Sequence, residues 1–253
     1  MKQIVRFLLL TTASLALAVL PSVGTAAIGV SLPPRLVPAG HNPATTSTNW
    51  AGYAVPASAG AVSRVRGYWV VPAVTCSSGD QYSAVWIGID GYNSSSVEQT
   101  GTEQDCAGAT ARYSAWYEMY PALPTTLGMT IHPGDRMAAD VLARGSGTFT
   151  LQIENLTSGA KFSVNKVNKS AALSSAEWIV EAPSNLLHVL PLADFGTSYS
   201  VNSAATISGT TGVISSFAGA VPITMINGSN VVKAQPSGLA GNGGTFKVVW
   251  QHK

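Results

Sequence analysis

The segment AEWIVEAPS, residues 176–184, places two carboxylates, Glu177 and Glu181, four positions apart in an otherwise largely apolar stretch. The chain has only 12 acidic residues, so two of them around Trp178, Ile179 and Val180 are notable. Successive side chains of a β-strand point to opposite faces, so a strand here carries both glutamates on one face. Carboxylates placed in this way can transfer protons during catalysis.

Two other segments combine carboxylates with tryptophans. In SAVWIGIDG (83–91) a strand places Trp86 and Asp90 on one face, and in YSAWYEMYP (113–121) it does the same for Trp116 and Glu118. In SVEQTG (96–101) Gln99 shares a face with Val97. These faces together predict a groove with aromatic walls and an acidic floor. The alternative is that each of these side chains is ordinary solvated surface.

Other catalytic arrangements are missing from the sequence. There is no G-x-S-x-G nucleophile motif, no H-E-x-x-H spacing and no pair of Asp-Thr/Ser-Gly motifs. We therefore expect neither a bound metal nor a cofactor. What remains for proton transfer is a carboxylate, assisted by a neutral amide or an aromatic hydroxyl.

The elements that must position these residues are short strands. From Asn49 onward, runs of β-branched and aromatic residues such as RVRGYWVV, TFTLQIEN and TFKVVW are separated by Gly, Ser, Asn and Pro. This pattern predicts an all-β fold, an antiparallel β-sandwich or barrel. No internal repeat or change of composition divides the chain, so we expect one domain over residues 49–253.

Composition and the N-terminus indicate export. Charged residues make up 10% of the chain and its net charge is +2, without a basic run, so a nucleic-acid partner is not expected. Lys2 and Arg6 precede an apolar run that ends in small residues, which is the pattern of a signal peptide over residues 1–26. Residues 27–48 read as a linker or short propeptide. We expect a secreted, extracellular protein with no membrane contact after signal cleavage.

The chain has two cysteines, Cys76 and Cys106. A disulfide persists in the oxidising environment of a secreted protein, so we expect these two residues to be bridged. No histidine stands near either at ligand spacing, which disfavours a metal site.

Several motifs, in order and spacing, resemble the eqolisin family of glutamic peptidases, in a form typical of secreted bacterial members. They are NWAGYAV (49–55), AVWIGIDG (84–91), VEQTG (97–101), YSAWYEMYP (113–121), ENLTSG (154–159) and AEWIVEAPS (176–184). The resemblance implies a sandwich of two antiparallel, about seven-stranded sheets. It also implies an acid endopeptidase acting on polypeptide substrates, which we expect to be a monomer.

Carried over residue by residue, the resemblance assigns the catalytic pair to Gln99 and Glu181. It assigns substrate-binding roles in the groove to Trp86, Asp90, Trp116 and Glu118. Many family members have Asp where this chain has Ser114, so Ser114 is expected to affect the pH dependence of the groove. Glu177 lies on the same strand face as Glu181 and is expected to tune or position the site. The equally weighted alternative for Glu177 is a partly buried structural carboxylate.

Peptide hydrolysis without a covalent intermediate needs a base for water, a donor to the developing oxyanion and an acid for the leaving amine. Glu181 can serve as base and then as acid, and the Gln99 amide can donate to the oxyanion. A partly ionised base predicts a working pH near the carboxylate reference pKa of about 4.3. The alternative function is a secreted carbohydrate-binding module, in which Trp86 and Trp116 stack on sugar rings.

Overall fold

The computed structural model of the protein describes residues 45–185 and 188–253. The expected signal peptide (1–26) and most of the expected linker (27–48) lie outside this range. Within it, the one helical element is a short 3-10 turn, Ile214–Ser216. None of the described residues belongs to a helix with the length and hydropathy needed to cross a membrane.

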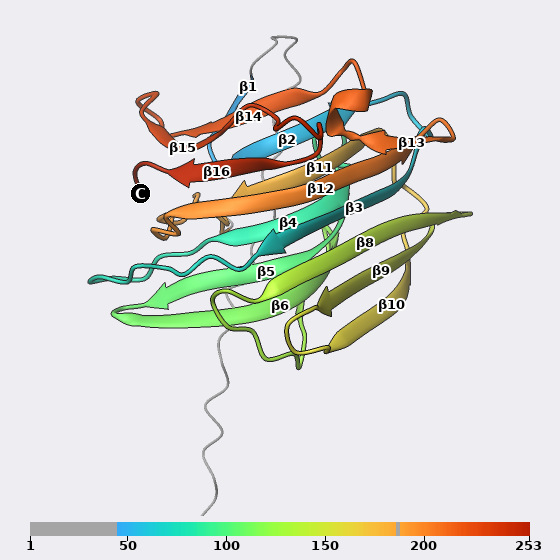
Figure 1. Ribbon diagram of the computed structural model, residues 1–253. Coiled ribbons are helices and arrows are strands. Elements are labelled where there is room, and N and C mark those ends of the chain that lie inside the picture. Colours follow the sequence, from blue (N-terminus) through green and yellow to red (C-terminus); the bar gives the residue numbers. More distant parts are fainter. Residues whose placement is uncertain (1–44, 186–187) are drawn as a thin grey trace, which may run out of the picture.

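Strands make up nearly all of the regular structure (Figure 1). They are β1 (Thr45–Ser47), β2 (Trp50–Pro56), β3 (Val62–Val70), β4 (Ala84–Ile89), β5 (Val97–Ala107), β6 (Thr110–Tyr120), β7 (Thr125–Thr126), β8 (Arg136–Gly145), β9 (Thr148–Asn155), β10 (Lys161–Val167), β11 (Ser175–Glu181), β12 (Thr197–Ile207), β13 (Thr210–Val213), β14 (Val221–Ile226), β15 (Val232–Pro236) and β16 (Phe246–Trp250). The predicted all-β fold is confirmed.

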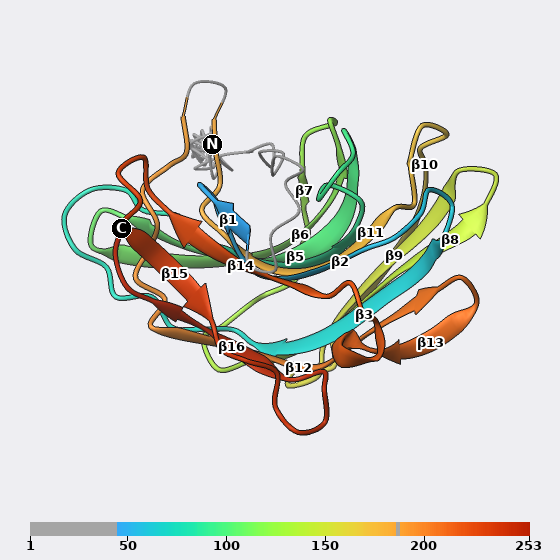
Figure 2. The same ribbon diagram turned by 90° about the horizontal axis from the view of Figure 1, so that it is seen from above.

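The strands form two layers that pack face to face (Figure 2). Layer A has the order β14-β2-β11-β4-β5-β6-β7, and layer B has the order β10-β9-β8-β3-β12-β16-β15. The expectation of two separate sheets differs from the structure in one respect, because β14 also pairs with β15. Hydrogen bonding therefore runs from one layer into the other, and the layers are two halves of one folded sheet.

One strand, β1, lies on the N-terminal side of the expected domain boundary at Asn49. β1 lies within the segment expected to be a linker, and it pairs in parallel with β14, with Thr45 opposite Ile223 and Ser47 opposite Met225. Apart from this short parallel pair, the ladders between the named strands are antiparallel.

The main core lies between the two layers. In β3, Val65, Gly67 and Trp69 are buried, whereas Arg66 and Tyr68 between them are exposed, as expected for a strand with one solvated face. Two buried indoles also bond across the layers. Trp69 donates to the Thr102 hydroxyl at 3.0 Å, and Trp178 donates to the carbonyl of Arg66 at 2.8 Å.

Layer A differs from layer B because several of its strands are buried on both faces. Every residue of β11 is buried. Trp178 and Val180 enter the core between the layers, while Ile179 joins a second apolar cluster on the outer face of layer A. The other members of that cluster are Trp50, Ala54, Ala84, Trp86, Tyr92, Val97, Trp116 and Ile223. This outer face of layer A is the one predicted to carry the carboxylates.

Two glycines allow the strands of layer A to approach closely. A Cβ at Gly52, where φ is +146°, would lie 2.1 Å from the carbonyl oxygen of Trp178. A Cβ at Gly101 would lie 2.3 Å from the carbonyl oxygen of Val85. Both distances are far inside van der Waals contact, so only glycine fits at these positions without movement of the backbone.

The predicted disulfide between Cys76 and Cys106 is confirmed. It ties the loop between β3 and β4 to the end of β5 and closes a loop with a sequence separation of 30. A loop of this length corresponds to a stabilisation of about 3 kcal/mol, largely through the unfolded chain.

Replacing both cysteines, as Cys76→Ala with Cys106→Ala, is expected to lower the free energy of unfolding by about 3 kcal/mol. The measurement is urea unfolding of the variant and the parent protein under non-reducing conditions. A reductant should lower the stability of the parent protein to that of the variant and leave the variant unchanged. Equal stability of parent and variant without reductant would contradict the structural role of the bridge.

Candidate active site

The strand register of layer A sets one row of polar side chains across its outer face. Glu177 on β11 lies opposite Gly88 on β4, Gly88 lies opposite Gln99 on β5, and Gln99 lies opposite Glu118 on β6. The Gln99 amide nitrogen donates a hydrogen bond to a carboxyl oxygen of Glu118. Its amide oxygen is buried, and none of the described residues donates a hydrogen bond to it. Gln99 therefore retains an acceptor, and one amide hydrogen, for a further group.

A second row, four positions along the same strands, contains the other glutamate of β11. Glu181 lies opposite Ala84, Ala84 lies opposite Glu103, and Glu103 lies opposite Ser114. Two donors hold the Glu181 carboxyl group. The Trp86 indole N–H donates to Oε2 at 2.7 Å, and the Asn49 side-chain amide donates to Oε1 at 3.2 Å. Each oxygen of Glu181 is thus fixed by one bond and can still accept another.

Glu181 and Gln99 meet at one small cavity of about 20 Å³. A water molecule needs roughly 10–15 Å³ of such space, so the cavity is large enough for one. The structure thus brings together the two residues expected to form the catalytic pair, along with the expected groove residues Trp116 and Glu118. The lining residues are Ala84, Gln99, Glu103, Trp116, Glu118, Pro124, Glu181 and Pro183.

Trp86 separates the two glutamates of β11. A Cβ at Gly88 would lie 3.1 Å from Cζ3 of Trp86, so the indole lies against Gly88. Trp86 also packs edge-on against Trp50, with ring centroids 5.0 Å apart. Since this indole is packed on both sides and bonded to Glu181, its geometry does not favour stacking on a sugar ring.

Glu177 is fully buried and does not line the cavity. Burial raises its pKa well above the ordinary value, although the nearby Ser175 hydroxyl and Tyr92 backbone N–H oppose the shift. Neither of its oxygens has a hydrogen bond of normal geometry. Burial therefore favours the neutral form of Glu177, an arrangement closer to the structural alternative than to direct contact with substrate.

The structure does not bring Asp90 to this cavity. Asp90 follows the last residue of β4 with a φ of +71°, which ends the alternation of the strand. Its carboxylate accepts the backbone N–H groups of Leu173 at 2.8 Å and Ser174 at 2.7 Å, and the Ser174 hydroxyl at 3.1 Å. The position of Asp90 is that of a loop anchor, which does not support the expected substrate-binding role.

Ser114 acts on the cavity through a neighbour. Its hydroxyl donates to Oε2 of Glu103 at 3.0 Å, and Glu103 lines the cavity. Burial raises the pKa of Glu103, and the Ser114 bond opposes that shift. This contact is consistent with the tuning role expected for Ser114.

The two carboxyl groups nearest to Gln99 differ in acidity. Burial raises the pKa of Glu181 to about 8, and the bonds from Trp86 and Asn49 work against that rise. Burial, followed by the charge of nearby Glu181, raises the pKa of Glu118 to about 9. Burial therefore favours the neutral form of both carboxyl groups in acid.

This geometry can be compared with known proteins. Residues 48–241 match the Peptidase A4 family. The chain belongs to this family. The resemblance to glutamic peptidases stated from the motifs is thereby confirmed.

Two named relatives in the Peptidase A4 family come from fungi. The chain is 32% identical to aspergillopepsin-2 of Aspergillus niger over 190 residues, which are 65% of this chain and 66% of the relative. It is 33% identical to scytalidopepsin B of Scytalidium lignicola over 143 residues, 54% of this chain and 53% of the relative. The chain thus spans less than two thirds of the length of either.

Solved structures of glutamic peptidases have the same fold. Scytalido-glutamic peptidase with a transition-state analogue inhibitor superimposes with a TM-score of 0.71 at 25% identity, over 81% of this chain and 99% of that one. Aspergilloglutamic peptidase from Aspergillus niger superimposes with a TM-score of 0.61 at 27% identity, over 68% of this chain and 99% of that one.

Sequence reasoning missed three residues of this Peptidase A4 site. Asn49 and Trp50 open the NWAGYAV motif, but the motif alone does not show that they contact Glu181 and Trp86 from the neighbouring strand β2. Glu103 follows Gln99 on β5 by two periods of the strand, each of two residues, so both side chains lie on the same face. Extending the period of two along β5 would have found Glu103.

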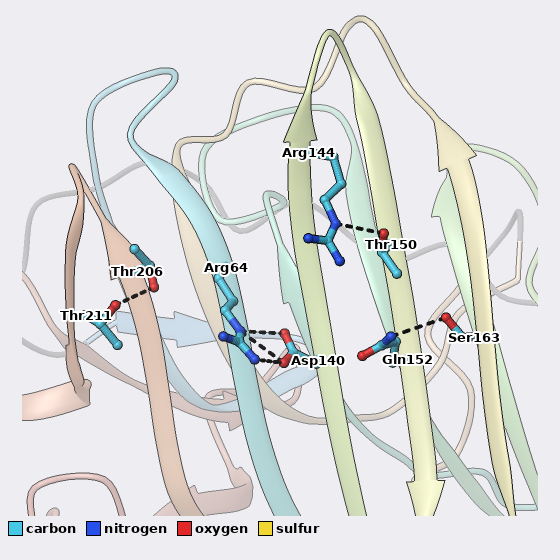
Figure 3. Close-up of polar contacts among 8 residues, drawn as sticks. All are labelled: Arg64, Asp140, Arg144, Thr150, Gln152, Ser163, Thr206 and Thr211. Atoms are coloured by element: carbon cyan, nitrogen blue, oxygen red, sulfur yellow. Dashed lines mark hydrogen bonds and ion pairs between the residues drawn. The ribbon is translucent and has the colours of Figure 1, made fainter.

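A larger depression, of about 530 Å³, lies over β3, β8, β9 and β10 in layer B. Its polar groups bond mainly to one another (Figure 3). Arg64 pairs with Asp140, and Gln152 donates to Ser163 at 3.4 Å. Unlike the cavity in layer A, this surface places no unpaired buried group at its floor. Among the described residues, no three His, Cys, Asp or Glu side chains are arranged to hold a metal ion.

The buried carboxyl groups predict that the fold is most stable in acid. The pKa of Glu98 and Glu181 is about 8 and that of Glu118 about 9 in the folded protein, against roughly 4.3 in an unfolded chain. Below pH 4 these carboxyl groups are mainly protonated in both the folded and the unfolded state, so the free energy of unfolding has its full value. Between about pH 4.3 and 9 the unfolded state ionises first, so the free energy of unfolding should fall by several kcal/mol.

Urea unfolding at pH 4 and pH 7.5 measures this change. Glu177→Gln removes one buried ionisable group and should make the decline with pH shallower. Glu154→Gln alters a partly exposed glutamate of β9 that pairs with Lys161, and serves as the control that should keep the decline of the parent protein. Greater stability at pH 7.5 than at pH 4 would show that burial does not raise the pKa of these carboxyl groups in the folded protein.

Proposed function

We propose that this chain is a secreted acid endopeptidase that hydrolyses polypeptide substrates as a monomer, with Glu181 and Gln99 as its catalytic pair. The observation that carries the proposal is the cavity of about 20 Å³ where these two side chains meet. The relatives in the Peptidase A4 family are named as peptidases, which supports the reaction class. The signal-peptide pattern and the disulfide support secretion.

The residues around the pair suit a peptide bond. Trp116 forms an apolar wall of the cavity, Trp86 lies behind it with its indole bonded to Glu181, and Glu118 stays protonated in acid because its pKa is about 9. A protonated carboxyl group can both donate to a peptide carbonyl and accept from a peptide N–H. Trp86, Trp116 and Glu118 thus retain the substrate-binding roles expected of them.

Glu181 carries its proton at acid pH, since its pKa is about 8. We therefore assign it the first proton transfer as an acid. It donates to the oxygen of the scissile carbonyl while a water molecule, held by the free amide oxygen of Gln99, attacks the carbonyl carbon. The resulting Glu181 carboxylate takes a proton from the attacking water.

The second half of the cycle breaks the peptide bond. Glu181 returns the proton it took from water to the leaving nitrogen, the C–N bond breaks, and the proton left on the original carbonyl oxygen passes back to Glu181. The Gln99 amide hydrogen not used by Glu118 stabilises the tetrahedral intermediate. This order differs from the base-first order expected from the sequence, because burial favours the neutral form of Glu181.

Glu181→Gln is expected to lower kcat on a denatured casein substrate at least a hundredfold at every pH, because an amide cannot exchange the proton. Gln99→Ala should lower kcat about 10² to 10³-fold through loss of the water-holding and oxyanion contacts. The measurement is the release of new peptide N-termini at pH 3 to 5.

Glu154→Gln is the matched control, since it makes the same chemical change on layer B and should retain full activity. Each variant must show the circular dichroism spectrum of the parent protein. A folded Glu181→Gln protein with more than about a tenth of parental turnover, a barrier change below 1.4 kcal/mol, would exclude Glu181 as the proton donor.

The pH profile separates the two orders of proton transfer. If protonated Glu181 acts first, kcat/KM should stay level through the acid range and fall tenfold per pH unit above the pKa of Glu181, about 8 in the empty site. A tenfold loss per unit below that pKa would instead assign the first step to the ionised base. Circular dichroism at each pH distinguishes titration from unfolding.

A further inference from the structure

Lys233 is a buried cation that the proposed mechanism does not use. It lies on β15, next to Ala234 of the main core, and exposes only 6% of its surface. Among the described residues, no carboxylate forms an ion pair with its ammonium group and no side chain accepts a hydrogen bond from it. The ammonium nitrogen is not one of the fully buried unpaired atoms, so it keeps some accessible surface where a ligand can meet it.

The Lys233 side chain borders a cavity of about 460 Å³ that shares no lining residue with the cavity at Glu181. One wall is apolar and consists of Val189, Leu190 and Pro191. The opposite side comes from residues 78–81, Asn227 and Lys253. The cavity therefore combines an apolar wall with two cations.

The polar groups of this cavity favour an anion. The acidic side chain in its lining, Asp80, already accepts the backbone N–H of Gly108 at 2.9 Å. The side-chain oxygen of Asn227 accepts the N–H groups of Ser229 at 2.9 Å and Val231 at 3.0 Å, which leaves its amide NH₂ as a donor. Lys233 and Asn227 thus offer donors that a ligand oxygen can accept.

We propose that this cavity binds a carboxylate that carries an apolar group, either a small organic acid or the C-terminal end of a peptide. The Lys233 ammonium and the Asn227 amide bind the carboxylate, and Val189, Leu190 and Pro191 pack against the apolar group. A carboxylate is the counter-charge that the described residues do not supply to Lys233.

The acidity of Lys233 supports the geometry. Burial lowers its pKa to about 8, so the side chain is still charged at pH 6. A bound carboxylate favours the charged form and should raise this pKa. Binding should therefore weaken as the pH rises through 8.

The experiment is thermal unfolding of the full chain at pH 6 and constant ionic strength, with N-acetyl-leucine as the probe. Each tenfold excess over its dissociation constant should raise the unfolding temperature by about 3 to 6 °C. Acetate tests a free anion, and the dipeptide Ala-Leu tests a peptide end. N-acetyl-leucinamide lacks the charge and should give no shift.

Lys233→Met keeps the length of the side chain and removes the charge, so the response to N-acetyl-leucine should disappear. Lys247→Met changes an exposed lysine on the neighbouring strand β16 and should respond as the parent protein does. An equal shift with the amide, or an unchanged shift in Lys233→Met, overturns the carboxylate site. An equal shift with acetate overturns the assignment of an apolar ligand.

Discussion

The register of β11 between β2 and β4 is the constraint on which the site depends. Opposite Trp50 and Ala84, Glu181 comes within reach of Asn49 and of the Trp86 indole. A slip by one residue would turn both glutamates into the core between the layers and bring Trp178 to the outer face. Because all seven residues of β11 are buried, such a slip is opposed along the whole strand. The same packing that stabilises the fold thus fixes the position of the Glu181 carboxyl group.

Burial on both faces of layer A has a direct chemical consequence. It shifts the carboxyl groups toward their neutral forms, with a pKa of about 8 for Glu181 and about 9 for Glu118. In acid these groups can remain buried without the cost of an unpaired charge. A fold that encloses so many carboxyl groups is therefore suited to an acidic medium, and the reaction order proposed for Glu181 uses the form that this medium favours.

The period of two along each strand was enough to predict which side chains of the regular strands share a face. Val85, Ile87 and Ile89 enter the core, opposite to Trp86, and Trp116 and Glu118 share the outer face with Gln99. The pattern failed where the regular strand ends, because the positive φ of Asp90 turns its carboxylate toward a distant loop. It also could not show that the Trp86 indole bonds to Glu181, because these residues are 95 positions apart in the sequence. Nor could it show that the pairing of the consecutive strands β14 and β15 continues the hydrogen bonding from one layer into the other.

Lys233 and Glu181 show one principle acting in opposite directions. Burial raises the pKa of the acid and lowers that of the amine, and it brings both to about 8. The difference lies in their partners. Glu181 accepts hydrogen bonds from two donors and borders a cavity that is large enough for one water molecule, so a ligand as small as water completes its hydrogen bonding. Lys233 has no fixed acceptor in the part of the chain that the structure describes, and it borders a far larger, partly apolar space. The group that completes its surroundings must therefore bring both a negative charge and apolar surface.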